Sequence, residues 1–294
     1  MVNGHRDRCW VTWPLLLISG GVSLGAVLPK NENLVGPWKL ASNVIGYIYF
    51  LAWSASFYPQ IILNYTRRTT RGLSVDFCAL NVLGYVCYST YTASFYWNES
   101  IQRDYKLRMS GSGDGDGVII QSNDVAFAAH ALMASLLTLT QIGCYDSFRT
   151  RPPSKRVQAF LIFSVVFCLL FITVTGDVLG LLFVLGAIKV SITVSKYIPQ
   201  VLLNYQRKST VGWNVQNVLL DLTGGILSFV QLYGDCANMK NWGGFKGNFA
   251  KVMISLITIG FDIIFLIQHY VMYPECDEHA GPYTQVPQTG KMES

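Results

Sequence analysis

Ionisable side chains interrupt several long apolar segments of this sequence. Asp124, Lys189, Lys196, Asp221 and Asp262 all occupy such positions. A charge at the centre of a bilayer costs at least about 2.5 kcal/mol on insertion scales, so each of these residues requires a functional or structural reason. An ammonium group at that depth would bind an anionic part of a solute, and a carboxyl group would bind and release protons. The charges therefore predict a site for an ionic solute within a membrane.

A duplicated segment singles out Asp221 among these residues. Tyr197-Ile198-Pro199-Gln200 repeats Phe57-Tyr58-Pro59-Gln60, and Leu, Asn, Tyr, Arg, Thr and Gly coincide further along both copies at the same constant offset. At this offset, Asp221 corresponds to Asn81, so one half carries a titratable carboxyl where the other carries a neutral amide. Secondary transporters are commonly built from two repeats with the substrate site between them. This asymmetry makes Asp221 the principal candidate for proton coupling.

The other charged positions have structural alternatives. Asp221 and Lys196 would also be explained by a structural ion pair, and Asp262 by a pair with a neighbouring helix. Asp124 begins an apolar segment, where a carboxylate often caps a helix. Lys189 and Lys196 are separated by about two helical turns and hence share one helix face. We expect these two lysines to bind carboxylate groups.

The duplicated Pro-Gln pairs predict hinges. Pro59 and Pro199 each lack a backbone N–H, so each is expected to kink its helix, with Gln60 and Gln200 satisfying the freed backbone groups. Kinks at equivalent depths in two repeats would suit alternating access.

Amide side chains close to these hinges are candidate substrate contacts. Asn204 lies one helical turn after Gln200, and Asn217 lies one turn before Asp221. Their amides would bind a carboxylate or an ammonium group, or else form packing hydrogen bonds between helices.

The composition predicts an all-α polytopic membrane protein. The 294 residues are 51% hydrophobic and only 13% charged. The formal net charge of +5 comes from short clusters of Lys and Arg between apolar segments, which follows the positive-inside rule and argues against nucleic acid as a partner. The seven cysteines show no metal-ligand spacing, so neither a metal site nor a cofactor is predicted.

Seven membrane-spanning helices are expected, arranged as two parallel three-helix repeats joined by a linker helix. The apolar segment 1–28 is interpreted as a probable signal peptide, with an uncleaved extra span as the alternative. The remaining divisions are a short luminal segment at 29–39, the first repeat at 40–145, a basic connector and linker helix at 146–176, the second repeat at 177–273 and a cytosolic tail at 274–294.

The segments outside the membrane carry address and modification signals. Asn98 belongs to an N-glycosylation acceptor, which agrees with a luminal loop. The basic clusters place the tail in the cytosol and the N-terminus in the lumen. A Gly/Asp-rich stretch at 110–117 is expected to be mobile.

The duplicated motifs resemble the PQ-loop family. Within that family, Lys196-Tyr197-Ile198-Pro199-Gln200, Ser122-Asn123-Asp124 and the segment from Asn217 to Gly225 are similar to the lysosomal cystine/proton symporters. The resemblance covers about residues 46–273. It implies export of L-cystine from an acidic organelle, the lysosome or vacuole, driven by protons. Residues Tyr283 to Val286 of the tail look like that group's tyrosine sorting signal, which implies adaptor proteins as cytosolic partners.

The resemblance also implies roles for individual residues. Asp221 would be the principal proton-coupling residue, with Asp124 as a second proton acceptor and Asp262 as a supporting carboxyl. The substrate pocket implied by the resemblance comprises Trp53, Asn81, Lys189, Lys196, Asn204, Asn217 and Asp221.

Two other functions remain as alternatives. One is an exporter of cationic amino acids from the same family, and the other is a non-transporting sorting receptor of similar architecture. No enzyme is predicted, because the sequence shows no nucleophile and base pair, metal cluster or phosphate-binding loop at interpretable spacing.

Overall fold

The structure is a computed structural model that describes residues 6–70, 73–110, 120–148, 152–210 and 215–273. Within these ranges all regular structure is helical, which confirms the predicted all-α class. The helices are α1 (Arg6–Val27), α2 (Trp38–Ala55), α3 (Tyr58–Arg67), α4 (Val75–Trp97), α5 (Glu99–Ser110), α6 (Ser122–Tyr145), α7 (Lys155–Thr175), α8 (Val178–Arg207), α9 (Val215–Asn238), α10 (Gly243–Gly247), α11 (Phe249–Ile267) and the π-helical turn η1 (Gln268–Met272).

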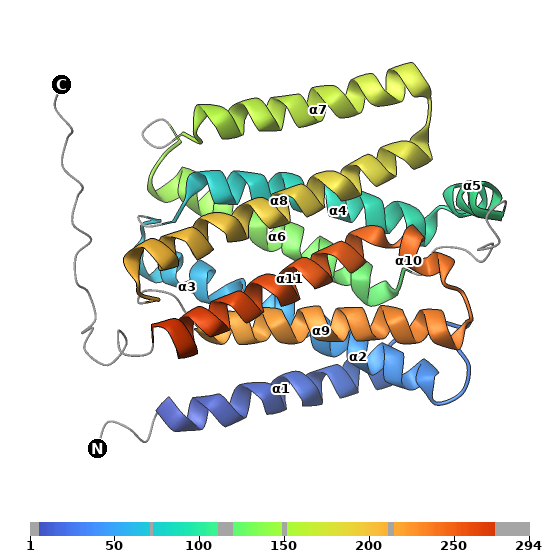
Figure 1. Cartoon of the computed structure of the whole chain (residues 1–294), viewed down its shortest axis with the longest axis horizontal. Coiled ribbons are helices and arrows are strands. Elements are labelled where there is room, and N and C mark those ends of the chain that lie inside the picture. The colour runs from blue at the N-terminus through green and yellow to red at the C-terminus, as the bar shows by residue number, and fades with distance from the viewer. Residues whose placement is uncertain (1–5, 71–72, 111–119, 149–151, 211–214, 274–294) are drawn as a thin grey trace.

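Five helical segments in the described part of the chain are long and apolar enough to cross a membrane. They are Trp38–Arg67, Ser122–Tyr145, Lys155–Thr175, Val178–Gln206 and Phe249–Met272. α4 and α9 run alongside them in the same bundle but contain more polar side chains (Figure 1). The predicted number of seven spans stays a prediction, whereas a polytopic helical bundle is confirmed.

Two three-helix units make up the bundle. The first contains α2 with α3, α4 and α6, and the second contains α8, α9 and α11 (Figure 1). The first helix of each unit packs against the second helix of the other, so that α2 contacts α9 and α8 contacts α4. This exchange of contacts creates an extensive interface between the repeats.

Two helices flank this bundle. α7 lies along its outside, with Ser164 as its one buried residue, as expected for a lipid-facing linker (Figure 1). α1 packs on α2 at the opposite side, where Gly21 and Gly25 come close to Ile48 and Val44. The side chain of Asn43 donates a hydrogen bond to the carbonyl of Gly25 at 2.9 Å. Cleavage after α1 remains a prediction.

The two Pro-Gln segments differ in their backbone. The first predicted span is divided, because α2 ends at Ala55 and α3 begins at Tyr58, with Pro59 in its first turn. The second is one continuous helix, α8, that runs through Pro199. Both end alike, since Arg68 and Lys208 each adopt the left-handed conformation with φ of 52°. These two residues are equivalent positions of the duplication.

We call the end of the bundle that carries α3 and the end of α8 the basic end, after Arg67, Arg68, Lys155, Arg156 and Lys208. The opposite end carries α5 and α10, and we call it the capped end (Figure 1). Asn98 lies there and caps α5, because its Oδ1 accepts hydrogen bonds from the backbone N–H groups of Ser100 and Ile101 at 3.0 and 3.3 Å. Most of the predicted Gly/Asp-rich stretch, together with Tyr283 and Val286, lies outside the described residues.

Candidate functional site

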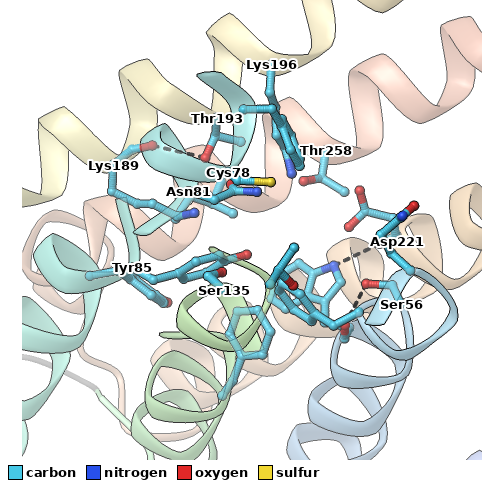
Figure 2. Close-up of a pocket in the computed structure, with 18 of the residues that line it drawn as sticks. Ser56, Cys78, Asn81, Tyr85, Ser135, Lys189, Thr193, Lys196, Asp221 and Thr258 are labelled. Atoms are coloured by element: carbon cyan, nitrogen blue, oxygen red, sulfur yellow. Dashed lines mark hydrogen bonds between the residues drawn. The ribbon is translucent and has the colours of Figure 1, made fainter. Parts of the chain in front are cut away.

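A cavity of about 270 Å³ lies between the two repeats. Its wall reaches from Lys251 and Tyr88 inside the bundle to Gln60 and Phe77 near the basic end, so this conformation faces the basic end. Six of the seven predicted substrate residues line it: Trp53, Asn81, Lys189, Lys196, Asn217 and Asp221 (Figure 2). The structure thus brings together predicted substrate residues from four helices, α2, α4, α8 and α9.

Asp221 is held at the cavity wall by two aromatic residues. The hydroxyl of Tyr197 donates a hydrogen bond to Asp221 Oδ2 at 2.6 Å, and the same ring stacks on Phe261 with centroids 5.1 Å apart. The indole Nε1 of Trp53 donates to the backbone carbonyl of Asp221 at 3.1 Å. Trp53 fits there because Gly224, one turn further along α9, has no side chain to obstruct it. The carboxylate is therefore positioned without a basic partner within ion-pair distance among the described residues.

Two of the three lysines that line the cavity, Lys189 and Lys196, lie on tyrosine rings. Lys189 Nζ is 3.7 Å from the ring centroid of Tyr85, and Lys196 Nζ is 4.6 Å from that of Tyr197. Neither forms an ion pair with any carboxylate in the described ranges. The suggested pairing of Asp221 with Lys196 is thus not formed in this conformation. Apart from Lys251, which is paired with Asp124, the cavity combines two lysine side chains, the Asp221 carboxyl group and the amides of Asn81 and Asn217, which suits a solute that bears charges of both signs.

Asn204 lies outside the cavity wall and joins helices of the second repeat. Its Oδ1 accepts from Gln200 Nε2 at 2.9 Å, and its Nδ2 donates to Gln268 Oε1 at 3.0 Å. Gln268 Nε2 then donates to the carbonyl of Val201 at 3.0 Å. This chain of amides connects the segment after Pro199 to the end of α11.

The first repeat contains the same amide chain. Gln60 donates to Asn64 at 2.8 Å, Asn64 donates to Gln141 at 2.9 Å, and Gln141 donates to the carbonyl of Ile61 at 3.0 Å. Gln60 and Gln200 therefore bind an asparagine side chain rather than the backbone groups freed by proline. Gln141 corresponds to Gln268 in this arrangement, which fixes how the third helices of the two repeats align, α6 with α11 and η1.

A buried ion pair closes the inner end of the cavity. Lys251 Nζ lies 2.6 Å from Asp124 Oδ1, and the two side chains are 2% and 1% exposed. Asp124 Oδ2 accepts from the backbone N–H of Gln121 at 3.0 Å, and the hydroxyl of Tyr49 donates to Oδ1. Asp124 therefore has the capping role considered from the sequence and an ionic role as well.

Amide side chains extend this ion pair across both repeats. Lys251 Nζ donates to Gln231 Oε1 at 2.8 Å, and Gln231 Nε2 donates to the carbonyl of Ser42 at 2.9 Å and to Asn123 Oδ1 at 3.2 Å. The network includes residues of α2, α6, α9 and α11, and we call it the closing network. It seals the capped end while the cavity faces the basic end.

Asp262 lies beyond the cavity wall and is 1% exposed. Its Oδ2 has no hydrogen-bond partner in the described part of the protein, and neither has Ser135 Oγ, at the equivalent position of the third helix in the first repeat. Asp262 is thus a buried carboxyl without an ion-pair partner in the part of the chain that the structure describes.

The sequence prediction missed Lys251, Asp235 and the tyrosines. Asp235 is fully buried and accepts from Trp38 Nε1 and Gln121 Nε2, each at 2.8 Å. Both charges lie near the ends of apolar segments, where solvation was the simpler expectation. Asp221 lies in the middle of an apolar segment, whereas Lys251 lies near the beginning of one, so the rule that identified Asp221 does not single out Lys251. The aromatic partners Tyr85 and Tyr197 carry no comparable signal in the sequence.

Comparison with known proteins agrees with this architecture. Residues 41–101 and 181–240 each match the model of the PQ loop repeat, and the two matches begin at equivalent positions of the duplication. The bundle, its central cavity and these matches define a polytopic membrane protein of the PQ-loop type.

Curated relatives define the family more narrowly. A cystinosin homolog of Arabidopsis thaliana is 38% identical over 254 residues, which cover 84% of this chain and 92% of the relative. The chain belongs to the cystinosin family. Cystinosin of Bos taurus is 37% identical over 247 residues, covering 83% of this chain and 65% of the relative. A cystine transporter of Saccharomyces cerevisiae is 28% identical over 261 residues, which cover 82% of this chain and 97% of the relative.

Proposed function

We propose that this protein is a proton-coupled symporter that exports L-cystine from the lysosome or vacuole to the cytosol. The single observation that carries the proposal is the cavity between the repeats, where Lys189, Lys196 and Asp221 lie among amide side chains. Relatives from a plant, an animal and a yeast bear the names cystinosin or cystine transporter. Family and cavity chemistry thus support the same substrate.

Cystine carries two carboxylates and two ammonium groups. Lys189 and Lys196 would bind the carboxylates, while Asn81, Asn217 and Asp221 would bind the ammonium groups. A sugar would be recognised by aromatic and amide groups alone, so the two lysines without a carboxylate partner favour a charged amino acid.

Asp221 is the proposed proton carrier. Asp221 lines the cavity, and the only hydrogen bond to its carboxylate within the described structure comes from Tyr197. A substrate carboxylate that pairs with Lys189 and Lys196 would occupy the same cavity as the proton that Asp221 takes up. Substrate and proton would thereby bind together, as symport requires. Asp262, buried nearby, would support this exchange.

The closing network is the proposed luminal gate. With the basic end in the cytosol, this structure faces the cytosol, and the Asp124–Lys251 pair separates the cavity from the lumen. Protonation of Asp124 would weaken that pair and favour opening toward the acidic side. The segment 29–39 and Asn98 would then be luminal. α1 begins at the basic end, so a luminal N-terminus requires removal of α1 (Figure 1).

The test is uptake of labelled cystine by proteoliposomes under an imposed proton gradient, with lysine, arginine and glucose as competitors. We expect gradient-driven accumulation that Asp221→Asn abolishes while the variant stays folded. Asp104→Asn, on the exposed face of α5, is the matched control and should transport normally. Preferential competition by lysine or arginine would instead indicate a cationic amino acid exporter. Binding without any flux would indicate a receptor.

A further inference from the structure

Two buried lysines of the cavity, Lys251 and Lys189, have different kinds of partner. Lys251 is paired with the carboxylate of Asp124 at 2.6 Å. Lys189 is equally buried, at 4% exposure, yet its ammonium group lies over the ring of Tyr85 rather than beside a carboxylate (Figure 2). A buried cation without any partner would be unstable, so the ring is the group that makes this position tolerable.

The surroundings of Tyr85 fix the orientation of its ring. Phe57 and Phe127 contact it edge to face, with centroids 5.8 and 6.2 Å away and interplanar angles of 64° and 85°. The preceding residue, Gly84, leaves room for the Lys189 chain, since a Cβ there would lie 3.3 Å from Lys189 Cδ. α4 therefore presents a groove for the lysine stem followed by an aromatic face for its ammonium group.

A lysine held in this way differs from an ion-paired one in what a ligand must displace. A substrate carboxylate that approaches Lys251 competes with Asp124. At Lys189 the ring covers one side of the ammonium group and accepts no conventional hydrogen bond from it, so its N–H groups remain directed to the cavity. Lys189 thus faces the cavity without a carboxylate partner among the described residues.

We propose that Tyr85 is a positioning residue that holds Lys189 Nζ over its ring and aims it at a substrate carboxylate. The inference rests on the proposed function and deepens it by assigning the anion selectivity of the cavity to an aromatic ring. The ring, not the hydroxyl, is the active part, because the Tyr85 hydroxyl forms no hydrogen bond with any described residue.

The experiment compares equilibrium binding of L-cystine with that of cystamine, its analogue without carboxylates, to purified full-length protein. Tyr85→Leu should weaken cystine binding by about tenfold and leave cystamine binding within about twofold, since only the former uses the Lys189 charge. Tyr85→Phe keeps the aromatic face and should retain the cystine affinity of the unmodified protein. Tyr85→Met fills the site with a flexible side chain and is the second variant should Tyr85→Leu fail to fold.

The matched control is Tyr205→Leu. Tyr205 also lies beneath a lysine, with Lys208 Nζ 3.6 Å from its ring centroid, but it is exposed and outside the cavity. This variant should bind both ligands normally. In a Lys189→Met background, Tyr85→Leu should cause no additional loss of cystine binding, because its effect passes through Lys189.

Equal losses for cystine and cystamine in Tyr85→Leu would show a purely structural role and overturn the inference, as would an unchanged cystine affinity. Both results leave the proposed function intact. Failure of the unmodified protein to bind cystine would overturn the proposed function and this inference with it.

Discussion

Asp124 and Lys251 occupy equivalent positions in the two repeats and form an ion pair with each other, with 2.6 Å between Oδ1 and Nζ. The offset in numbering that relates them is the same one that relates Gln141 to Gln268. A pair between equivalent positions lies at the pseudo-symmetry axis of the bundle, where the two repeats meet. Divergence of one position to a carboxylate and the other to an ammonium group has thereby connected the halves.

Replacement of one member of the Asp124–Lys251 pair should destabilise the protein, because the other member stays buried without its partner. Lys251→Met leaves the Asp124 carboxylate uncompensated and should lower the free energy of unfolding by about 3–5 kcal/mol. Thermal or denaturant unfolding in detergent measures this loss. Asp124→Asn combined with Lys251→Met should recover a large part of it, and strictly additive losses would contradict a direct interaction.

Side chains of the closing network lie so close to Gly46 that an alanine there should destabilise the protein more than an alanine at the equivalent Gly186. A Cβ on Gly46 would lie 2.4 Å from Gln231 Nε2 and 2.6 Å from Asn123 Oδ1, both fixed within the closing network. Gly46→Ala should therefore cost about 1–3 kcal/mol of stability through overpacking.

Gly186, the equivalent residue of the second repeat, is the internal control. A Cβ there would lie 3.0 Å from the ring of Phe249, so Gly186→Ala should be less damaging in the same unfolding measurement. Equal losses in both variants would show that the closing network imposes no special constraint on Gly46.

The prolines are expected to affect turnover more than binding. Pro59→Ala should favour a continuous helix across the break between α2 and α3 and slow transport, with little change in cystine affinity. Pro199→Ala should slow transport less, because α8 already runs through that position. Turnover and binding in proteoliposomes and detergent check this expectation, and unchanged turnover in both variants would refute a hinge at either site.

The capped end should resist acid. Arg108 donates two hydrogen bonds to Asp177 at 2.8 and 2.9 Å, and this guanidinium, together with the backbone N–H of Gly180, holds the pKa of Asp177 below its ordinary value. Because the folded-state pKa lies below the unfolded value of about 3.9, this contribution is complete above that value and is lost as the pH falls through the folded pKa.

Asp177→Asn isolates the ionic part, since asparagine is an equally good helix cap. The exposed setting limits the expected loss to about 0.2–1 kcal/mol. Thermal unfolding should show a constant difference between variant and unmodified protein from neutral pH to pH about 5, shrinking only below about pH 4. A difference that disappears already on going from neutral pH to pH about 5 would contradict the assignment.

Sequence patterns predicted the architecture and most of the cavity for identifiable reasons. A charge in an apolar segment is visible without a structure, and so is a duplication, so Lys189, Lys196, Asp221 and the two repeats were all found. Asn204 was expected in the pocket because its chemistry suits a substrate, yet its amide is used between helices. Composition cannot distinguish these two uses of an amide.

The remaining features depend on three-dimensional arrangement. Tyr85 and Tyr197 resemble any other aromatic residues of a membrane bundle until their distances to Lys189 and Asp221 are known. Lys251 lies in the first turn of α11, where a lysine ordinarily extends to water. Packing against Asp124 and Gln231 directs it inward instead.

The different backbones at the two Pro-Gln segments predict that the two repeats move differently during transport. α8 is a single continuous helix that carries Lys189, Lys196 and Tyr197, so these three side chains keep a fixed spacing along one helix. The jointed helix pair α2 and α3 carries Trp53 and Gln60 on the opposite wall. We therefore expect the wall formed by α2 and α3 to move during transport while the wall formed by α8 keeps its shape, even though the two walls belong to repeats of similar sequence.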